Sequence, residues 1–253
     1  MPLVATDAVV LHVFDYSETS RILRIATHEA GVVSVLARGA RRPKSRFGSA
    51  VDLFAQGTAQ LSLRDGRDLQ TLTAFDVTRA RPQIAADLER FTGAAALAEL
   101  MLRFGSEDVN EPLFATFVTA LDAIADALPG RAREAALAGA WRLVADMGFA
   151  PSLDACGACD APLEPSADAT FSHDAGGVLC ARCEHLHSPG RALPASARSM
   201  LGEWLAARRV PDLDERDARA HQRLLREFLG HHLSDGRSLR AFEVWEHGGW
   251  AAR

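Results

Sequence analysis

The spacing of apolar residues changes once along this chain, near residue 81, and that change limits the folds it can adopt. Before that point apolar and polar residues alternate over short runs, as around Val9 and Leu11, a pattern typical of strands. After it apolar residues recur every three or four positions, as in Leu97 and Met101, a pattern typical of amphipathic helices. Strands followed by helices predict an α+β protein. Its expected parts are a β domain at residues 1–80 and an α-helical domain at residues 81–253.

The first eighty residues contain five runs that we expect to be short strands. Turn signals separate them, including the Asp-Gly pair at 65–66. Five strands in so short a span favour a small barrel, because closure leaves no exposed sheet edge. After the run around Val9, the expected strands are ILRIAT from Ile22, VVSVLA from Val32, AQLSLRD from Ala59 and LQTLTAF from Leu69.

Beyond residue 81 the apolar spacing predicts several helices, of which the first begins at Pro82. Proline suits the first position of a helix because its missing N–H is not needed there. Residues 152–193 interrupt the helices, look loop-like and contain all four cysteines, so we expect them to be an insertion in the helical domain. The helical repeats are Leu97, Leu100, Met101 and Phe104; Phe117, Leu121, Ile124 and Leu128; Leu137, Trp141 and Val144; Leu201, Trp204 and Leu205; and Ala218, His221, Leu225, Phe228 and His232.

The four cysteines form two C-x2-C pairs, Cys156 with Cys159 and Cys180 with Cys183, separated by twenty residues. Two such pairs brought together offer four thiolates to one tetrahedral Zn²⁺. Four protein ligands leave no open position for water, so we expect one structural zinc per chain rather than a catalytic one. Two disulfides and four reduced buried thiols are the alternatives.

A second candidate site is the stretch ARGARRPKSRFGSA at 37–50, which interrupts the expected strands. Proline and glycine make it a loop, and five cations without an acid lie within nine residues. Residues 1–80 hold ten basic and eight acidic residues, whereas the remainder holds 18 and 25, so a basic patch stands out in an acidic chain. A cationic loop on a small barrel is typical of single-strand binding. The candidate nucleic-acid contacts are Arg38, Arg41, Arg42, Lys44 and Arg46.

Phe47 ends this basic run and could stack on a base, so it is added to the candidate contacts. It could instead anchor the loop to the core. Tyr16, Phe14 and His12 are weaker candidates for stacking, and Phe14 is expected in the core.

No motif in the chain supports catalysis or membrane insertion. The stretch GARRPKS lacks the glycines of a phosphate-binding loop, and no metalloprotease, hydrolase or dinucleotide motif is present, so we expect a protein that is not an enzyme. No apolar run approaches the ~20 residues that span a bilayer. The start MPLVATDAVV lacks the features of a signal peptide, so a cytoplasmic location is expected.

The order of these features resembles the bacterial RecO family of recombination mediator proteins over nearly the whole chain. GARRPKSRFGSA at 39–50 and the two cysteine pairs carry most of the resemblance. DYSETSRILRIATHEAG at 15–31 and HHLSDGRSLRAFEVW at 231–245 are similar to that family as well.

The resemblance implies an N-terminal OB-fold, an α-helical C-terminal domain and a nucleoid-associated role in recombinational (RecF-pathway) DNA repair. It implies binding of single- and double-stranded DNA, annealing of complementary strands and help in loading RecA. The implied partners are RecR and the C-terminal tail of the single-stranded-DNA-binding protein (SSB). From the residues alone, a zinc-bearing RNA-binding or transcription adaptor and a metalloenzyme remain alternatives.

Overall fold

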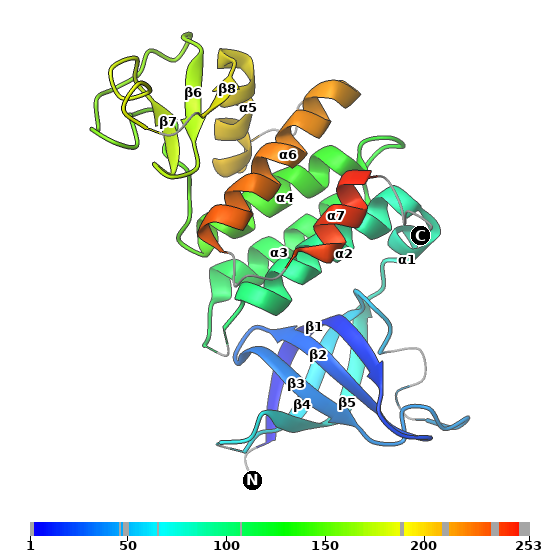
Figure 1. The fold of residues 1–253 in the computed structure, drawn as a ribbon. Coiled ribbons are helices and arrows are strands. Elements are labelled where there is room, and N and C mark those ends of the chain that lie inside the picture. Colours follow the sequence, from blue (N-terminus) through cyan, green and yellow to red (C-terminus); the bar gives the residue numbers. More distant parts are fainter. Residues whose placement is uncertain are drawn as a thin grey trace.

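The computed structural model has two parts, a β-barrel and a helical bundle, and the bundle carries a small β segment (Figure 1). This arrangement confirms the predicted α+β class. In the part of the chain that is described, no helix is both long and apolar enough to cross a membrane. The structure describes residues 3–45, 47, 51–64, 66–106, 108–187, 190–208, 213–233 and 238–247.

Five strands close into the barrel in the order β1-β2-β3-β5-β4, with β1 pairing β4. Neighbouring strands are antiparallel except β3 and β5, which are parallel. This closed five-stranded topology confirms the expected OB-type barrel. The strands are β1 (Leu3–Asp15), β2 (Arg21–Thr27), β3 (Gly31–Ala37), β4 (Gln56–Ser62) and β5 (Leu69–Arg79).

The helical bundle begins directly after β5, and Pro82 is at the start of its first helix, as predicted. Leu128 was expected to continue a helical face, but α3 ends at Ala125 and Leu128 is 74% exposed. The helices are α1 (Pro82–Ala86), α2 (Leu88–Phe104), α3 (Glu111–Ala125), α4 (Ala132–Asp146), α5 (Ala195–Leu205), α6 (Glu215–His232) and α7 (Arg240–His247).

Close packing of α3 against α4 depends on a glycine. A Cβ on Gly139 would lie 2.6 Å from the Cβ of Ala120, closer than side chains approach each other. Gly139 therefore lets the two helices approach, and Trp141 of α4 is fully buried in the same core.

Residues 152–193, which contain the four cysteines and are called the cysteine segment below, have more regular structure than the sequence indicated. Three short strands form a sheet in the order β7-β6-β8, in a region expected to be loop-like. Phe171 of β6 contacts Phe228 of α6 with ring centroids 5.9 Å apart, so this sheet packs on the bundle. The strands are β6 (Ala169–Ser172), β7 (Gly177–Leu179) and β8 (Arg191–Leu193).

A buried arginine joins the barrel to the bundle. The Nε of Arg81 lies 2.7 Å from Oδ1 of Asp122 on α3, and its other nitrogens donate to the Phe54 carbonyl and to Gln56. Its side chain is 1% exposed. Burial lowers the pKa of Arg81, although the hydrogen bond to Asp122 opposes that effect. This network fixes how the barrel sits on the helices.

Candidate functional site: a cationic barrel face and a four-cysteine centre

The basic loop connects β3 to β4 at one end of the barrel, and the charged groups it carries face solvent. Arg38, Arg41, Arg42 and Lys44 are all exposed, whereas Arg46 lies outside the described residues. Arg38, Arg42 and Lys44 make no ion pair with any residue that the structure describes. Three of the predicted cations are therefore accessible to an anionic partner.

Arg41 holds the loop beside the turn between β1 and β2. Its guanidinium lies 3.6 Å from a carboxylate oxygen of Asp15 and donates to the Ser17 carbonyl at 3.0 Å. Its backbone N–H donates to the Thr19 carbonyl at 3.0 Å. Both charged side chains of the pair are partly exposed, and such pairs contribute at most about 1 kcal/mol, so a phosphate could compete for Arg41.

The prediction that Phe47 stacks on a base is wrong for this structure. Phe47 is 1% exposed and belongs to the cluster of apolar side chains that fills the barrel, together with Leu23 and Leu72. The alternative reading, an anchor for the loop, is the one that its burial supports. Burial of this ring offsets part of the conformational entropy that ordering so long a loop costs.

Exposed aromatic side chains instead lie on β1 and the turn after it. Phe14 is 48% and Tyr16 62% exposed, so the expectation of Phe14 in the core is also wrong. The rings of His12 and Phe14 stack, with centroids 4.1 Å apart and planes 25° from parallel. These three residues, weaker candidates in the sequence, are available for base stacking.

An irregularity in β1 explains why these rings face solvent. The pairing of β1 with β2 shifts register between Val10 and His12, which is typical of a β-bulge. Leu11, the residue at the shift, packs against the bundle, as Val9 does. After the shift Val13 packs against the barrel core, whereas His12 and Phe14 are exposed. The alternation of apolar and polar residues in the sequence does not reveal this register shift.

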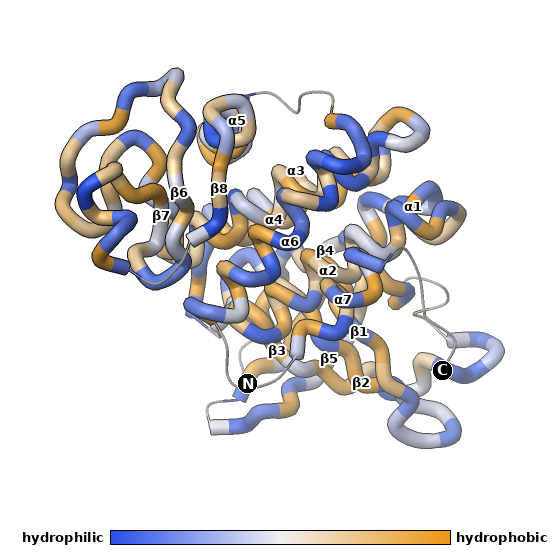
Figure 2. The backbone as a smooth tube through the Cα atoms, turned by 45° about the horizontal axis from the view of Figure 1, so that its top comes forward, coloured by the Kyte–Doolittle hydropathy of each residue, from blue (hydrophilic) through white to orange (hydrophobic). Residues whose placement is uncertain are grey.

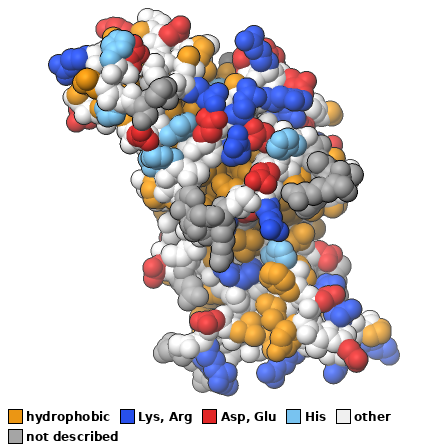
Figure 3. Space-filling model, viewed as in Figure 1, with side chains coloured by type: hydrophobic (Ala, Val, Ile, Leu, Met, Phe, Trp, Pro, Cys, Tyr) orange, Lys and Arg blue, Asp and Glu red, His pale blue; other side chains and the backbone are white. Residues whose placement is uncertain are grey.

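Strands β2 and β3 extend this face with basic and apolar groups. Arg24 pairs with His12 across the strands, and Ile22 pairs with both Phe14 and Leu36. Figure 3 shows apolar side chains gathered on the barrel beside a histidine, with basic groups at the edges. We call His12, Phe14, Ile22, Arg24 and Leu36 the barrel face. Arg24 has no signal in the sequence, because a single arginine within a strand forms no motif.

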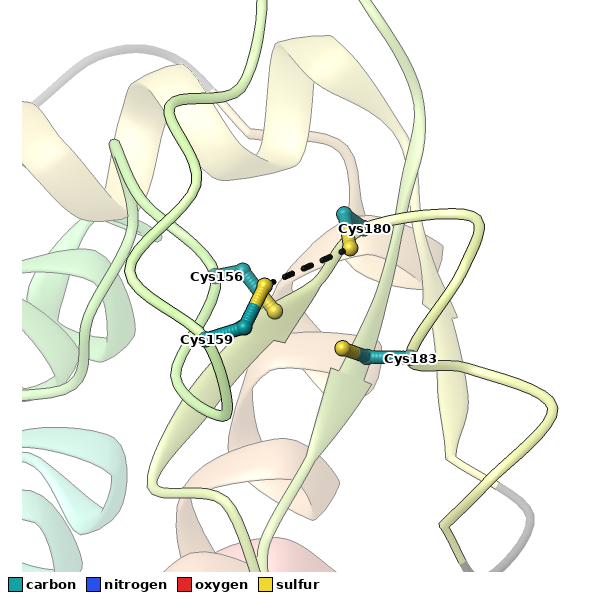
Figure 4. A group of neighbouring side chains, drawn as sticks. All are labelled: Cys156, Cys159, Cys180 and Cys183. Atoms are coloured by element: carbon teal, nitrogen blue, oxygen red, sulfur yellow. Dashed lines mark hydrogen bonds between the residues drawn. The ribbon is translucent and has the colours of Figure 1, made fainter.

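The four predicted cysteines meet at one point, from two turns of the cysteine segment (Figure 4). Their sulfur atoms all lie within 4.8 Å of one another, and those of Cys159 and Cys180 are 3.8 Å apart. Tetrahedral Zn–S bonds of about 2.3 Å place sulfurs about 3.8 Å apart, whereas a disulfide requires about 2.05 Å. The arrangement fits a metal centre, and all four cysteines are free of disulfides.

The backbone around the cysteines favours thiolates. Burial alone raises the pKa of Cys156, but backbone N–H groups of Cys180, Ala158 and Cys159 stabilise its thiolate and lower that pKa to about 6. A hydrogen bond shared with Cys159, and then burial, raise the pKa of Cys183. The raised pKa of Cys183 opposes ionisation of all four cysteines without a cation, and a divalent ion such as Zn²⁺ would stabilise all four as thiolates.

A glycine allows the first of these turns to form. A Cβ on Gly157 would lie 2.4 Å from the Ala175 carbonyl oxygen, a distance that real side chains do not reach. Its backbone N–H donates to the Val178 carbonyl at 2.8 Å, which joins the first cysteine turn to β7.

Comparison with known families decides what kind of protein this is. A family model described as "Recombination protein O N terminal" matches residues 1–81, and one described as "Recombination protein O C terminal" matches residues 85–240. The chain belongs to the RecO family. The resemblance noted in the sequence is thereby confirmed.

Similar proteins include several RecO family members that are named DNA repair protein RecO. The protein of that name from Anaeromyxobacter sp. (strain K) is 36% identical over 252 residues, 95% of each chain. That from Anaeromyxobacter dehalogenans (strain 2CP-1 / ATCC BAA-258) is 36% identical over 244 residues, 92% of each chain. That from Desulforudis audaxviator (strain MP104C) is 32% identical over 243 residues, which cover 92% of this chain and 94% of the other.

Proposed function

We propose that this RecO family protein takes part in DNA repair by binding single- and double-stranded DNA and annealing complementary strands, without making or breaking bonds. The observation that carries the proposal is the set of exposed cations beside exposed aromatic rings at one end of the barrel. Residues 1–80 would be the nucleic-acid-binding domain. We further propose RecR and the SSB C-terminal tail as partners and RecA loading as the consequence, and membership of the RecO family supports these proposals.

The charges of this surface explain how annealing could proceed without catalysis. Two polyanionic strands repel each other, and the repulsion falls when cations screen their phosphates. Arg38, Arg42 and Lys44 supply such cations, and Arg41 joins them when a phosphate displaces Asp15. Stacking on Phe14 and Tyr16 would hold bases without selecting a sequence, because every base offers a flat face.

Zinc is the second part of the proposal. We assign one structural Zn²⁺ to Cys156, Cys159, Cys180 and Cys183, because their sulfurs are spaced for tetrahedral coordination. When bound, the ion neutralises the thiolates and ties two turns together. Metal analysis of purified protein should find about one zinc per chain, and much less than one would contradict the assignment.

Annealing of complementary oligonucleotides, followed by fluorescence, tests the DNA proposal. The variant Arg41→Ala/Arg42→Ala/Lys44→Ala, called the loop variant, should anneal much more slowly. For single strands its log–log salt dependence of affinity should flatten by about 2, since each lost cation contributes about 0.7. Unchanged annealing by a folded loop variant would place the DNA contact elsewhere.

Two further arms separate the alternatives. A variant that removes three exposed or partly exposed arginines outside the barrel, Arg142→Ala/Arg208→Ala/Arg240→Ala, controls for total charge and should anneal closer to the parent rate. Complementary RNA strands in the same assay test the RNA-binding alternative. Faster annealing of RNA than of DNA would favour that alternative over DNA repair.

A further inference from the structure

Four arginines form a line along the solvent side of α6. Arg216, Arg219, Arg223 and Arg226 are spaced three or four residues apart, which puts them within about 80° of arc on a helix of 3.6 residues per turn. The buried residues of α6, including Leu225 and Phe228, lie on the opposite side. We call these four residues the α6 arginine row. Figure 3 shows basic groups, with acidic ones among them, over this part of the molecule.

Two arginines of this row carry uncompensated charge. Arg216 and Arg223 are exposed and have no ion-pair partner among the described residues. Arg219 lies 2.5 Å from Glu215, and Arg226 lies 2.5 Å from Glu246. The side chains of Arg219 and Glu215 are 55% and 68% exposed, and an ion pair so exposed to solvent is weak. An incoming anion could therefore recruit Arg219 as well.

The neighbouring acids do not cancel the row. Glu227 lies four residues after Arg223, at the border of the row, and is occupied by Arg191, 2.5 Å away, and by His173. Glu215 and Asp217 lie in the first turn of the helix, where negative charge stabilises the helix dipole. A surface that served only solubility would intersperse both signs along the row itself, whereas here the acids lie at its borders.

The shape and chemistry of the row favour a phosphate backbone over an acidic peptide. Arg216 and Arg226 are ten residues apart, or about 15 Å along the axis, so the row is long enough to contact consecutive phosphates of one strand. Peptide recognition normally adds an apolar pocket to the charges. An apolar pocket lined by Phe104, Leu229, Leu233 and Leu239 adjoins only Arg226, at one end of the row. Arg216 and Arg223, which carry the uncompensated charge, do not line it.

We propose that the α6 arginine row is a second nucleic-acid contact, which holds a second strand through its phosphates while the barrel holds the first. This inference rests on the proposed DNA-binding function. The row belongs to the helical bundle, and the basic loop lies at the end of the barrel, so the two surfaces are separate in Figure 1. Two separate surfaces on one chain would bring two strands together, as annealing requires.

The test uses two non-complementary oligonucleotides of about six nucleotides, within the range that one OB-fold covers. One carries a fluorescence donor and the other an acceptor. The parent should show energy transfer between them, because both occupy one chain. The row variant Arg216→Gln/Arg223→Gln should lose most of the transfer while its affinity for a single oligonucleotide at the barrel stays within about twofold, since one site remains.

A matched control and a second background sharpen the result. Arg142→Gln/Arg208→Gln removes the same charge from the same part of the chain and should keep the transfer. In the loop variant, the remaining single-strand binding should depend on the row. Adding the two row substitutions to that variant should therefore flatten the log–log slope of affinity against salt concentration by about 1.4.

The outcomes separate this inference from the proposed function. Binding of one oligonucleotide by the parent without transfer, or full transfer in the row variant, would overturn the second contact and leave the barrel proposal intact. Failure of the parent to bind either oligonucleotide would overturn the proposed function itself. Competition at the row by an acidic peptide but not by an oligonucleotide would replace the strand with a protein partner.

Discussion

The barrel and the cysteine segment at residues 152–193 are both small β structures, but different interactions hold them together. Fourteen buried apolar residues of the described chain fill the barrel, among them Leu23, Leu61 and Leu72. The buried cluster around the cysteines has three described members, Cys156, Leu179 and Cys183. Strands of three or four residues enclose too little apolar surface to stabilise themselves, so a metal can take the place of a core. The difference predicts opposite responses to substitution.

Replacement of two of the proposed zinc ligands should give the largest effect, and only in the cysteine segment. Cys156→Ser/Cys183→Ser should abolish zinc binding and unfold residues 152–187, since structural zinc contributes about 10–16 kcal/mol in small zinc domains. Metal analysis and hydrogen exchange would measure this. Fast exchange confined to the segment, with protected barrel amides, is the expected pattern. A segment that stays protected without zinc would show that packing of Phe171 on the bundle suffices.

Two phenylalanines of the barrel test the other half of the comparison. Phe47→Ala removes a ring from the barrel core and should lower the free energy of unfolding by about 3–5 kcal/mol. Phe14→Ala removes an exposed ring and should change stability by about 0.5 kcal/mol or less, but weaken single-strand binding by about 1–3 kcal/mol. Chemical denaturation and fluorescence anisotropy measure the two quantities. Equal effects of both substitutions on stability would contradict the assigned positions.

The link between barrel and bundle should respond less strongly. Asp122→Ala leaves the buried Arg81 guanidinium without its carboxylate and should cost about 3 kcal/mol. Asp126→Ala removes only an exposed partner of Arg79 and serves as the control, with a loss below about 1 kcal/mol. Denaturation monitored separately in the two parts would show whether the barrel unfolds with the helices. Similar losses for both variants would mean that the buried pair is dispensable.

Acid should weaken the bundle next to the cysteine segment. Burial lowers the pKa of His221 to about 4, so between pH 6.5 and 4 the unfolded chain binds a proton that the folded chain excludes. Stability from this residue is therefore lost as the pH falls through that window, by about 2 kcal/mol between pH 7 and pH 5. Denaturation of the parent and of His221→Leu at both pH values isolates the effect. Equal pH dependence in both proteins would show that His221 titrates normally.

Much of the fold could be predicted from local patterns. The runs at Ile22 and Val32 became β2 and β3, and the repeat containing Trp141 became α4. Leu128 followed the helical spacing but lies beyond the end of α3, because spacing alone does not say where a helix stops. The strands of the cysteine segment were missed because each has at most four residues.

The candidate site was predicted in part, since charge and spacing can be read locally but burial cannot. The four cysteines converge as the two C-x2-C pairs predicted. The exposed cations of the loop are where the sequence indicated, yet Phe47 and Phe14 exchanged their expected places. A bulge in β1 and the closure of the barrel decide which ring is buried, and neither has a signature in the sequence.

By itself, the sequence determined the α+β class, the pairing of the four cysteines that cluster in the structure and the charge of the β3–β4 loop. Each depends on the identity and order of nearby residues, which folding does not alter. Only the tertiary structure decided that aromatic rings lie outside the barrel, that Arg81 is buried against Asp122 and that four arginines of α6 face solvent together. Burial and exposure depend on which distant segments pack against a residue, and that is settled only when the whole chain has folded.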